Sequence, residues 1–440
     1  MIRHALIVGA AALVLAAAAA PVQAQPTLTL QDVQQLAVRN YEAVQLAKSS
    51  VEQARLLRKQ AFSAVLPNVN VNGTYTRNLV SAEFEFGGRT IQVLPGNDYS
   101  FGFTFSQPIY AGFRELKALR QTDANIEAAG VALGTTVQDT VLNVTRGYYR
   151  VLGAREFVTI SRRALDLAQA TLRTSESLYR AGEAVETAVL RNRVAVSSAQ
   201  RQLLDAENGL VLAREQLRIF LGIQDDFQVT RPPAPAPPAG ALDELIQAGL
   251  KQRSELQALD LQRRIAELEI EKRRGAYLPT VKADGSVIQR RASFPSNRIG
   301  SVAINATWNV FNGGRTGAEV ASAEATLHET DLRRELLRKQ TENEVRTAFL
   351  RIQALRANVD TLTQQVEVAR RNADETGRAY KVGEATDLDV LSANELLVRS
   401  ERDLLEATFS YELAMYELQR AVGIFAADLV AAAAPGGQDR

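Results

Sequence analysis

YRAGEA, at residues 179–184, recurs 201 positions later as YKVGEA at residues 380–385. The same offset relates two further pairs of segments: 109–114 with 310–315, and 221–223 with 422–424. An internal repeat of this length has to be recognised before single motifs are read, because it fixes the architecture. The chain is therefore one structural unit written twice. Each copy is expected to bend at its glycine, Gly182 or Gly383, as chains commonly do just past a helix end.

The composition excludes several classes of function. The 51 Lys and Arg residues balance the 50 Asp and Glu residues, whereas a nucleic-acid partner would need a concentrated basic surface. Cysteine is absent, so a disulfide or a thiolate metal site is impossible. His4 and His328 are the only histidines, and no nucleophile–base pair or phosphate loop is present. The sequence therefore predicts a protein that is not an enzyme and needs no cofactor or metal.

The first 24 residues have the pattern of a secretory signal peptide. Arg3 and His4 form a short basic start, residues 5–20 are apolar, and small residues precede a cleavage site expected after Ala24. A transmembrane anchor is the alternative, but the apolar run is shorter than the roughly 20 residues needed to span a bilayer. We expect no membrane-spanning helix in the mature chain.

In each copy the spacing of apolar residues then changes from that of a helix to that of a strand. A helix is predicted over 31–66 and ends at Pro67, and the helix of the second copy ends at Pro279. Apolar and polar residues alternate after each proline, as in two strands joined by a loop, and the first loop contains Gly87-Gly88 and Pro95-Gly96. Aromatic, alternating strands of about ten residues fit an outer-membrane barrel. An ordinary half-buried sheet on a helix is the alternative.

Long helices follow each strand pair. Apolar residues recur every seven positions along 114–179 and again along the second copy, up to Tyr179 and Tyr380, which favours a left-handed supercoil. About 65 residues span roughly 100 Å. The returning helices, 185–221 and 387–422, cover about half of that length. We expect residues 221–223 to meet Thr27-Leu28 in a belt at mid-height.

The expected organisation is a mixed α/β membrane protein that is mainly helical. Its parts are listed here with their boundaries: signal peptide 1–24, first repeat 25–223 with strand hairpin 68–108 and helical hairpin 113–221, Pro-rich linker 224–241, second repeat 242–425 with strand hairpin 280–310 and helical hairpin 314–422, and disordered tail 426–440. Four strands cannot close a barrel, and lipid does not tolerate an open sheet edge. The chain must therefore oligomerise with cyclic symmetry, two copies giving eight strands and three giving twelve.

The doubled order of helix, strand hairpin and helical hairpin resembles the TolC-type outer-membrane efflux proteins. Leu-Pro before each first strand, glycine and arginine at the exit from the second, and Tyr-x-x-Gly at the bends contribute to the resemblance, which covers about residues 27–425. It implies a homotrimer with a twelve-stranded β-barrel in outer-membrane lipid and a coiled-coil tunnel through the periplasm. It also implies docking to a periplasmic adaptor and to an inner-membrane pump of the RND or ABC type. Drug efflux and type I protein secretion share such a conduit.

The resemblance also implies an aperture at the second bend. Tyr380 matches the gate tyrosine of the family and Asp389 matches one of its ring aspartates, with Asp387 beside it. Ala385 occupies the place of the gate arginine and Ser392 that of a second aspartate, so we expect Arg378 or Lys381 to substitute. Family adaptors contact the bends, which makes Gly182, Glu183, Gly383 and Glu384 candidate contact residues. We expect the second bend to line the aperture and the first to support it from outside.

Two of these residues have structural alternatives. Thr386 and Asp389 are spaced as in a helix capping box, with the carboxylate three residues after the cap. Tyr179 and Tyr380 continue the seven-residue repeat, which favours core packing. For the whole chain, the alternative to a channel is a trimeric coiled-coil scaffold or an adaptor in the periplasm.

Overall fold

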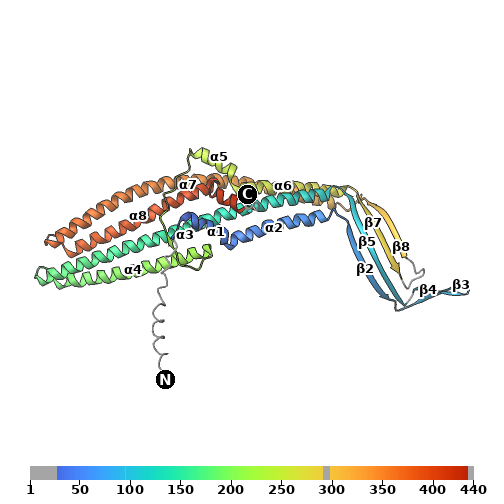
Figure 1. Cartoon of the computed structure of the whole chain (residues 1–440). Coiled ribbons are helices and arrows are strands. Elements are labelled where there is room, and N and C mark those ends of the chain that lie inside the picture. The colour runs from blue at the N-terminus through green and yellow to red at the C-terminus, as the bar shows by residue number, and fades with distance from the viewer. Residues whose placement is uncertain (1–26, 95, 291–297, 435–440) are drawn as a thin grey trace, which may run out of the picture.

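A computed structural model of the chain describes residues 27–94, 96–290 and 298–434 and shows a long helical rod with a sheet at one end (Figure 1). Two helices of 67 residues run along most of the rod: α3 (Arg114–Arg180) and α7 (Arg315–Lys381). At about 1.5 Å per residue, each spans about 100 Å. Helices α4 (Glu186–Leu221) and α8 (Asp387–Val422) return alongside them. The two predicted helical hairpins are confirmed.

The predicted signal peptide lies outside the described residues. Within residues 27–94, 96–290 and 298–434, no helix is both long enough and apolar enough to cross a membrane.

One antiparallel sheet takes strands from both copies, in the order β2–β5–β7–β8. Its strands are β2 (Asn68–Arg77), β5 (Asn97–Ala111), β7 (Thr280–Arg290) and β8 (Arg298–Thr307). On one face of the sheet, Val71 lies opposite Phe103. On the other face, Asn72 lies opposite Gly102, and its side-chain amide donates to Thr104 Oγ1 (3.3 Å). The predicted alternation is confirmed, although β8 ends at Thr307 rather than continuing to residue 310.

The loop predicted between the first two strands is wrong for most of its length. It contains a second ribbon, formed by β3 (Ala82–Phe86) and β4 (Arg89–Leu94). Gly87 and Gly88 both have positive φ, +60° and +75°, as the tight turns that match the twist of a ribbon require. The chain from Pro67 to Gly182 is 11 residues longer than that from Pro279 to Gly383, and this ribbon accounts for the difference.

The helix that leads into each strand pair is broken in two, so the single helix predicted over 31–66 is wrong. The first copy has α1 (Leu30–Asn40) and α2 (Glu42–Ser63), and the second has α5 (Leu242–Gln252), α6 (Ser254–Arg274) and a 3₁₀ turn (Gly275–Tyr277). Tyr41 and Arg253 at the breaks have extended backbones. Each break packs against the end of a returning helix. Asn40 donates to Leu221 O (2.8 Å) at the end of α4. Gly423, at the end of α8, approaches Arg253 so closely that an added Cβ would lie 3.0 Å from the Arg253 nitrogen.

Small residues at seven-residue spacing form the seams of both helical hairpins. The buried positions are Asn192, Ala199, Ala206 and Ala213 on α4, and Ala393, Ser400, Ala407, Ala414 and Ala421 on α8. Such residues let two supercoiled helices approach closely. Tyr380 continues the repeat into the core, with 6% of its surface exposed, as predicted. Tyr179 is 47% exposed, so its predicted core role is wrong.

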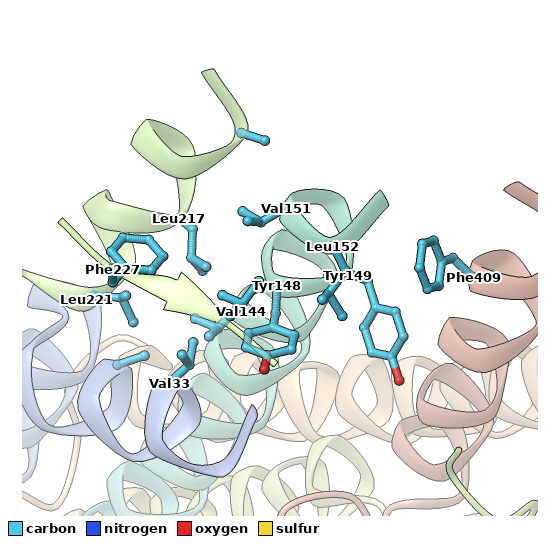
Figure 2. Close-up of a cluster of buried hydrophobic side chains, with 13 residues drawn as sticks. Val33, Val144, Tyr148, Tyr149, Val151, Leu152, Leu217, Leu221, Phe227 and Phe409 are labelled. Carbon is cyan, nitrogen blue, oxygen red and sulfur yellow. The ribbon is translucent and has the colours of Figure 1, made fainter. Parts of the chain in front are cut away.

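The predicted belt is confirmed at the centre of the rod. Leu217 and Leu221 of α4, Val33 of α1 and Tyr148 of α3 are fully buried in one cluster (Figure 2). β1 (Thr27–Leu28) pairs in parallel with β6 (Gln228–Val229) at its edge. The cluster also includes Phe409 of α8, so it joins the two copies.

The linker and the C-terminal segment both pack on the rod. Within the predicted linker, Arg231 donates to Glu412 Oε1 of α8 (2.9 Å) and lies over the Phe409 ring. The tail predicted from residue 426 is wrong in its first part, since α9 (Ala427–Ala433) packs on α3. Small apolar residues such as Val430 give α9 a face that fits beside Gly134. Residues 435–440 lie outside the described part of the chain.

Candidate functional site

Both bends end their long helix in the same way. Gly182 and Gly383 have φ of +79°, and Glu183 N donates to Leu178 O just as Glu384 N donates to Ala379 O, each at 2.9 Å. This backbone pattern is the glycine-dependent Schellman motif. The candidate contact residues Gly182, Glu183, Gly383 and Glu384 are all exposed at the end of the rod.

The Tyr380 side chain crosses from α7 to the first helical hairpin. Its hydroxyl lies 2.7 Å from Ser175 Oγ on α3, and Asn192 Nδ2 on α4 donates to the same oxygen at 2.6 Å. Ser175 and Asn192 are fully buried. The network therefore ties three helices together near the bends. Since Ser175 Oγ also donates to Thr171 O, the Tyr380 hydroxyl acts as donor to it.

Asp387 forms the second contact between the hairpins. Arg191 of α4 donates from Nε to Oδ2 (2.8 Å) and from Nη2 to Oδ1 (2.9 Å) of this carboxylate at the start of α8. Asp387 is only 7% exposed, whereas the Arg191 side chain is half exposed. The carboxylate raises the pKa of Arg191 by hydrogen bonding and by its charge. A bidentate pair of this kind fixes geometry as well as contributing energy.

Asp389 forms a capping box, which confirms the structural alternative for this residue. Its Oδ2 accepts from Thr386 N (2.9 Å) and Thr386 Oγ1 (2.7 Å), and its own N–H donates to Thr386 Oγ1. The side-chain hydrogen bond, followed by the backbone one, lowers the pKa of Asp389 from its usual value. The carboxylate is exposed and ionised at neutral pH. The first copy differs here, because Val185 caps α4 without any side-chain bond.

The two cations expected to replace the family's gate arginine do not lie between the hairpins. Arg378 pairs with Glu375 on its own helix at 3.1 Å, and Lys381 is exposed at the end of α7. The guanidinium that joins the hairpins belongs to Arg191. Sequence reasoning missed Arg191, Ser175 and Asn192. The one available signal was Asn192, a polar residue at a seam position that is alanine at the next three repeats of seven.

No cluster of metal-ligating side chains occurs in the described ranges. The bends thus present a closed contact between two helical hairpins, made of a buried hydroxyl network and one ion pair.

Comparison with known proteins places the chain in a family. The model for the family described as "Outer membrane efflux protein" matches residues 33–223 and 245–424, which is most of the chain. The chain belongs to the outer membrane efflux protein family. Family membership confirms the resemblance seen in the sequence and the predicted location in the outer membrane.

Individual relatives are distant but match over nearly the full length. The outer membrane protein TolC of Escherichia coli is 23% identical, with 90% of this chain and 82% of TolC covered. The alkaline protease secretion protein AprF of Pseudomonas aeruginosa is 21% identical, with 90% and 85% covered. The crystal structure of the CmeC outer membrane channel of Campylobacter jejuni superposes with a TM-score of 0.77 at 18% identity, covering 90% of this chain and 86% of CmeC. At 18% identity, the similarity to CmeC shows a shared fold.

Proposed function

We propose that this outer membrane efflux protein is the exit duct of a tripartite efflux or type I secretion system. In this proposal three copies form a twelve-stranded β-barrel in the outer membrane, continued by a coiled-coil tunnel through the periplasm. Substrates pass through it passively, while an inner-membrane pump of the RND or ABC type supplies the energy. A periplasmic adaptor joins the two.

One observation carries the proposal: the sheet at the end of the rod has four strands and two unpaired edges, β2 and β8. An edge of this kind cannot face lipid, because its N–H and C=O groups would lack partners. Pairing β8 of one copy with β2 of the next satisfies both edges. Three copies then give twelve strands and a lumen.

The distribution of apolar residues supports the same assembly. On the face of the sheet that carries Val71 and Phe103, β8 contributes Val302, which is 88% exposed, and Ile304, which is 72% exposed. These residues fit contact with lipid, while Asp284 and Asn305 on the other face fit a water-filled lumen. In the rod, α4 and α7 lie at the two ends of the helix order α4–α3–α8–α7. Their exposed apolar residues, such as Val194 and Val368, fit packing between copies.

For the closed aperture we infer a latch within each chain. The Tyr380–Ser175 contact and the Arg191–Asp387 pair both join the two helical hairpins. The tips of the hairpins, at the two bends, therefore cannot separate until both contacts break. Asp389 is exposed beside this latch, where three copies would form a carboxylate ring that attracts cations. If Asp389→Ala leaves conductance and cation selectivity unchanged, the ring is wrong.

The channel proposal is tested on purified protein in planar lipid bilayers. We expect detergent-dependent extraction from the outer membrane, a trimer on gels that dissociates on heating, and stepwise conductance increments. A periplasmic scaffold or adaptor would instead be extracted by aqueous buffer and give no increments, which would contradict the proposal.

The adaptor contact is tested by crosslinking at the tips. The chain has no cysteine, so Glu183→Cys and Glu384→Cys each introduce a single thiol at an exposed position. We expect both to crosslink to a periplasmic adaptor in cells. Asp428→Cys, exposed on α9 near mid-height, serves as the control and should not. Equal yields at all three sites would contradict the proposed contact.

A further inference from the structure

A groove of about 630 Å³ runs along the seam where α3 of the first copy meets α8 of the second. Its floor is hollow because Gly153 and Ala154 have little or no side chain. A Cβ on Gly153 would lie only 3.4 Å from the Phe409 ring, so the ring forms part of the floor. Phe157 lines the groove on the side toward the bends. A cavity of this size and apolar lining suits a small organic molecule.

The charged groups at the rim are mainly cationic. Arg146, Arg150 and Arg402 line the groove, against Glu406 as the only carboxylate among its lining residues. Arg146 forms an ion pair with Glu417 at 2.8 Å. Among the described residues, Arg150 donates to the neutral Gln216 Oε1 (2.6 Å), and Arg402 lies over the Phe157 ring at 4.7 Å. Within the described part of the chain, neither of these two guanidinium groups has a carboxylate partner within ion-pair distance.

The groove opens away from the linker, which touches one groove residue through Arg231 over the Phe409 ring. The linker contacts α3 at Tyr148 and Arg155 and α8 at Glu412 and Gln419. At 3.6 residues per turn, groove residues Arg150, Phe157 and Ser410 lie about 140–180° around their helices from these contacts. The linker forms an additional layer on α3 and α8, which fits the outside of a tunnel but would block its interior. If the tunnel forms as proposed above, the groove therefore faces the lumen.

We propose that this groove binds small aromatic anions, that is aromatic carboxylates and sulfonates, on their way through the tunnel. The ring of such a molecule packs on the Gly153–Ala154 floor beside Phe409, while its anionic group accepts hydrogen bonds from both Arg150 and Arg402. Guanidinium groups suit planar carboxylates because two parallel N–H donors match two oxygens. The lumen position of this site rests on the proposed channel function, but binding to the groove itself does not.

The proposal is tested by titrating the purified full-length protein with 2-naphthoate and following the fluorescence of the probe. We expect saturable binding, and about tenfold weaker binding for Arg150→Gln or for Arg402→Gln, since each removes a charge-assisted hydrogen bond. Both residues are exposed, so neither change removes a buried group. Arg173→Gln, an exposed arginine on α3 outside the groove, should bind as the unmodified protein does. Neutral 2-naphthamide should bind weakly to all four proteins.

Three results would overturn the proposal: no saturable binding of 2-naphthoate, an equal loss with Arg173→Gln, or equal affinity for 2-naphthamide. The same preparations are examined in planar bilayers, so that the two proposals fail separately. Conductance without selective naphthoate binding rejects the groove and leaves the channel. Binding without conductance rejects the channel and leaves the groove.

Discussion

Arg191 on α4 and Asp387 on α8 belong to different helical hairpins, so their contact has to break before the tips can separate. Arg191→Ala leaves the nearly buried Asp387 carboxylate without its bidentate partner. We therefore expect higher single-channel conductance in planar bilayers. Arg193→Ala is the matched control, because Arg193 pairs with Glu176 inside one hairpin. Equal conductance of the two variants would show that the ion pair does not keep the tips together.

Tyr380 and Tyr179 occupy equivalent positions, but only the first contributes a buried hydroxyl. Tyr380→Phe removes the donor to Ser175 and should lower the free energy of unfolding by about 1 kcal/mol. Tyr179→Phe should have no measurable effect, since its side chain is exposed. Denaturant titration in detergent measures both. A similar loss for the two variants would mean that the network is not stabilising.

At the scale of the element, the start of α8 depends on pH through its cap. Hydrogen bonds from Thr386 hold the pKa of Asp389 below its ordinary value of 3.8. The stabilisation is therefore complete above about pH 4 and is lost as the pH falls through the lower folded-state pKa. Amide hydrogen exchange, corrected for intrinsic rates, should show the first turn of α8 fraying in acid. The first turn of α4, capped by Val185 without a side-chain bond, provides the internal control.

Helix α9 covers part of α3, and its apolar contacts can be tested. Val430 packs beside Gly134, so Val430→Asp places a charge against an apolar surface and should destabilise the chain by about 1–3 kcal/mol. Ala432→Asp, on the exposed face of α9, should change stability by less than about 0.5 kcal/mol. Thermal unfolding of the two variants measures the difference. A free tail would make them equivalent.

Elements set by local chemistry could be predicted from the sequence. Pro67, the two bend glycines and the seven-residue repeat are each sufficient for a local structure, and α3, α4, α7 and α8 lie where they were expected. The breaks at Tyr41 and Arg253 could not be predicted, because ordinary residues occupy them and tertiary contacts cause them. The Arg191–Asp387 pair depends on how two supercoils rotate against each other, which no local pattern records. Asp389 was identified from its spacing to Thr386.

At the scale of the whole molecule, Arg420 connects three helices near the middle of the rod. Its guanidinium donates to Asp139 of α3 (2.9 Å) and to Glu255 of α6 (2.7 Å). Burial raises the pKa of Glu255, but the hydrogen bond and charge of Arg420 outweigh it and bring this pKa to about 2. With an ordinary value of 4.5, the contribution to stability is complete above that pH and disappears as the pH falls toward 2.

We expect the contact of Arg420 with Glu255 to contribute about 2 kcal/mol to the free energy of unfolding, allowing for solvent screening at a partly exposed carboxylate. Glu255→Gln should remove that part of the acid dependence between pH 4.5 and 2, measured as the midpoint of denaturant unfolding against pH. Glu267→Gln, which affects an exposed pair one helix turn apart on α6, should leave the profile unchanged. An unaltered profile for Glu255→Gln would place the acid sensitivity elsewhere.

Helices α3 and α7 have 67 residues each, and the returning helices α4 and α8 have 36 residues each. These matched lengths restrict how the length of the rod can change. Because the seams repeat every seven residues, a cut of any other size turns the small residues away from their partner helix. A cut of seven residues shortens a helix by about 10 Å and preserves the seam, provided that all four helices lose the same step. The distance that the chain bridges can therefore change only in such steps, and only in both halves of the gene at once.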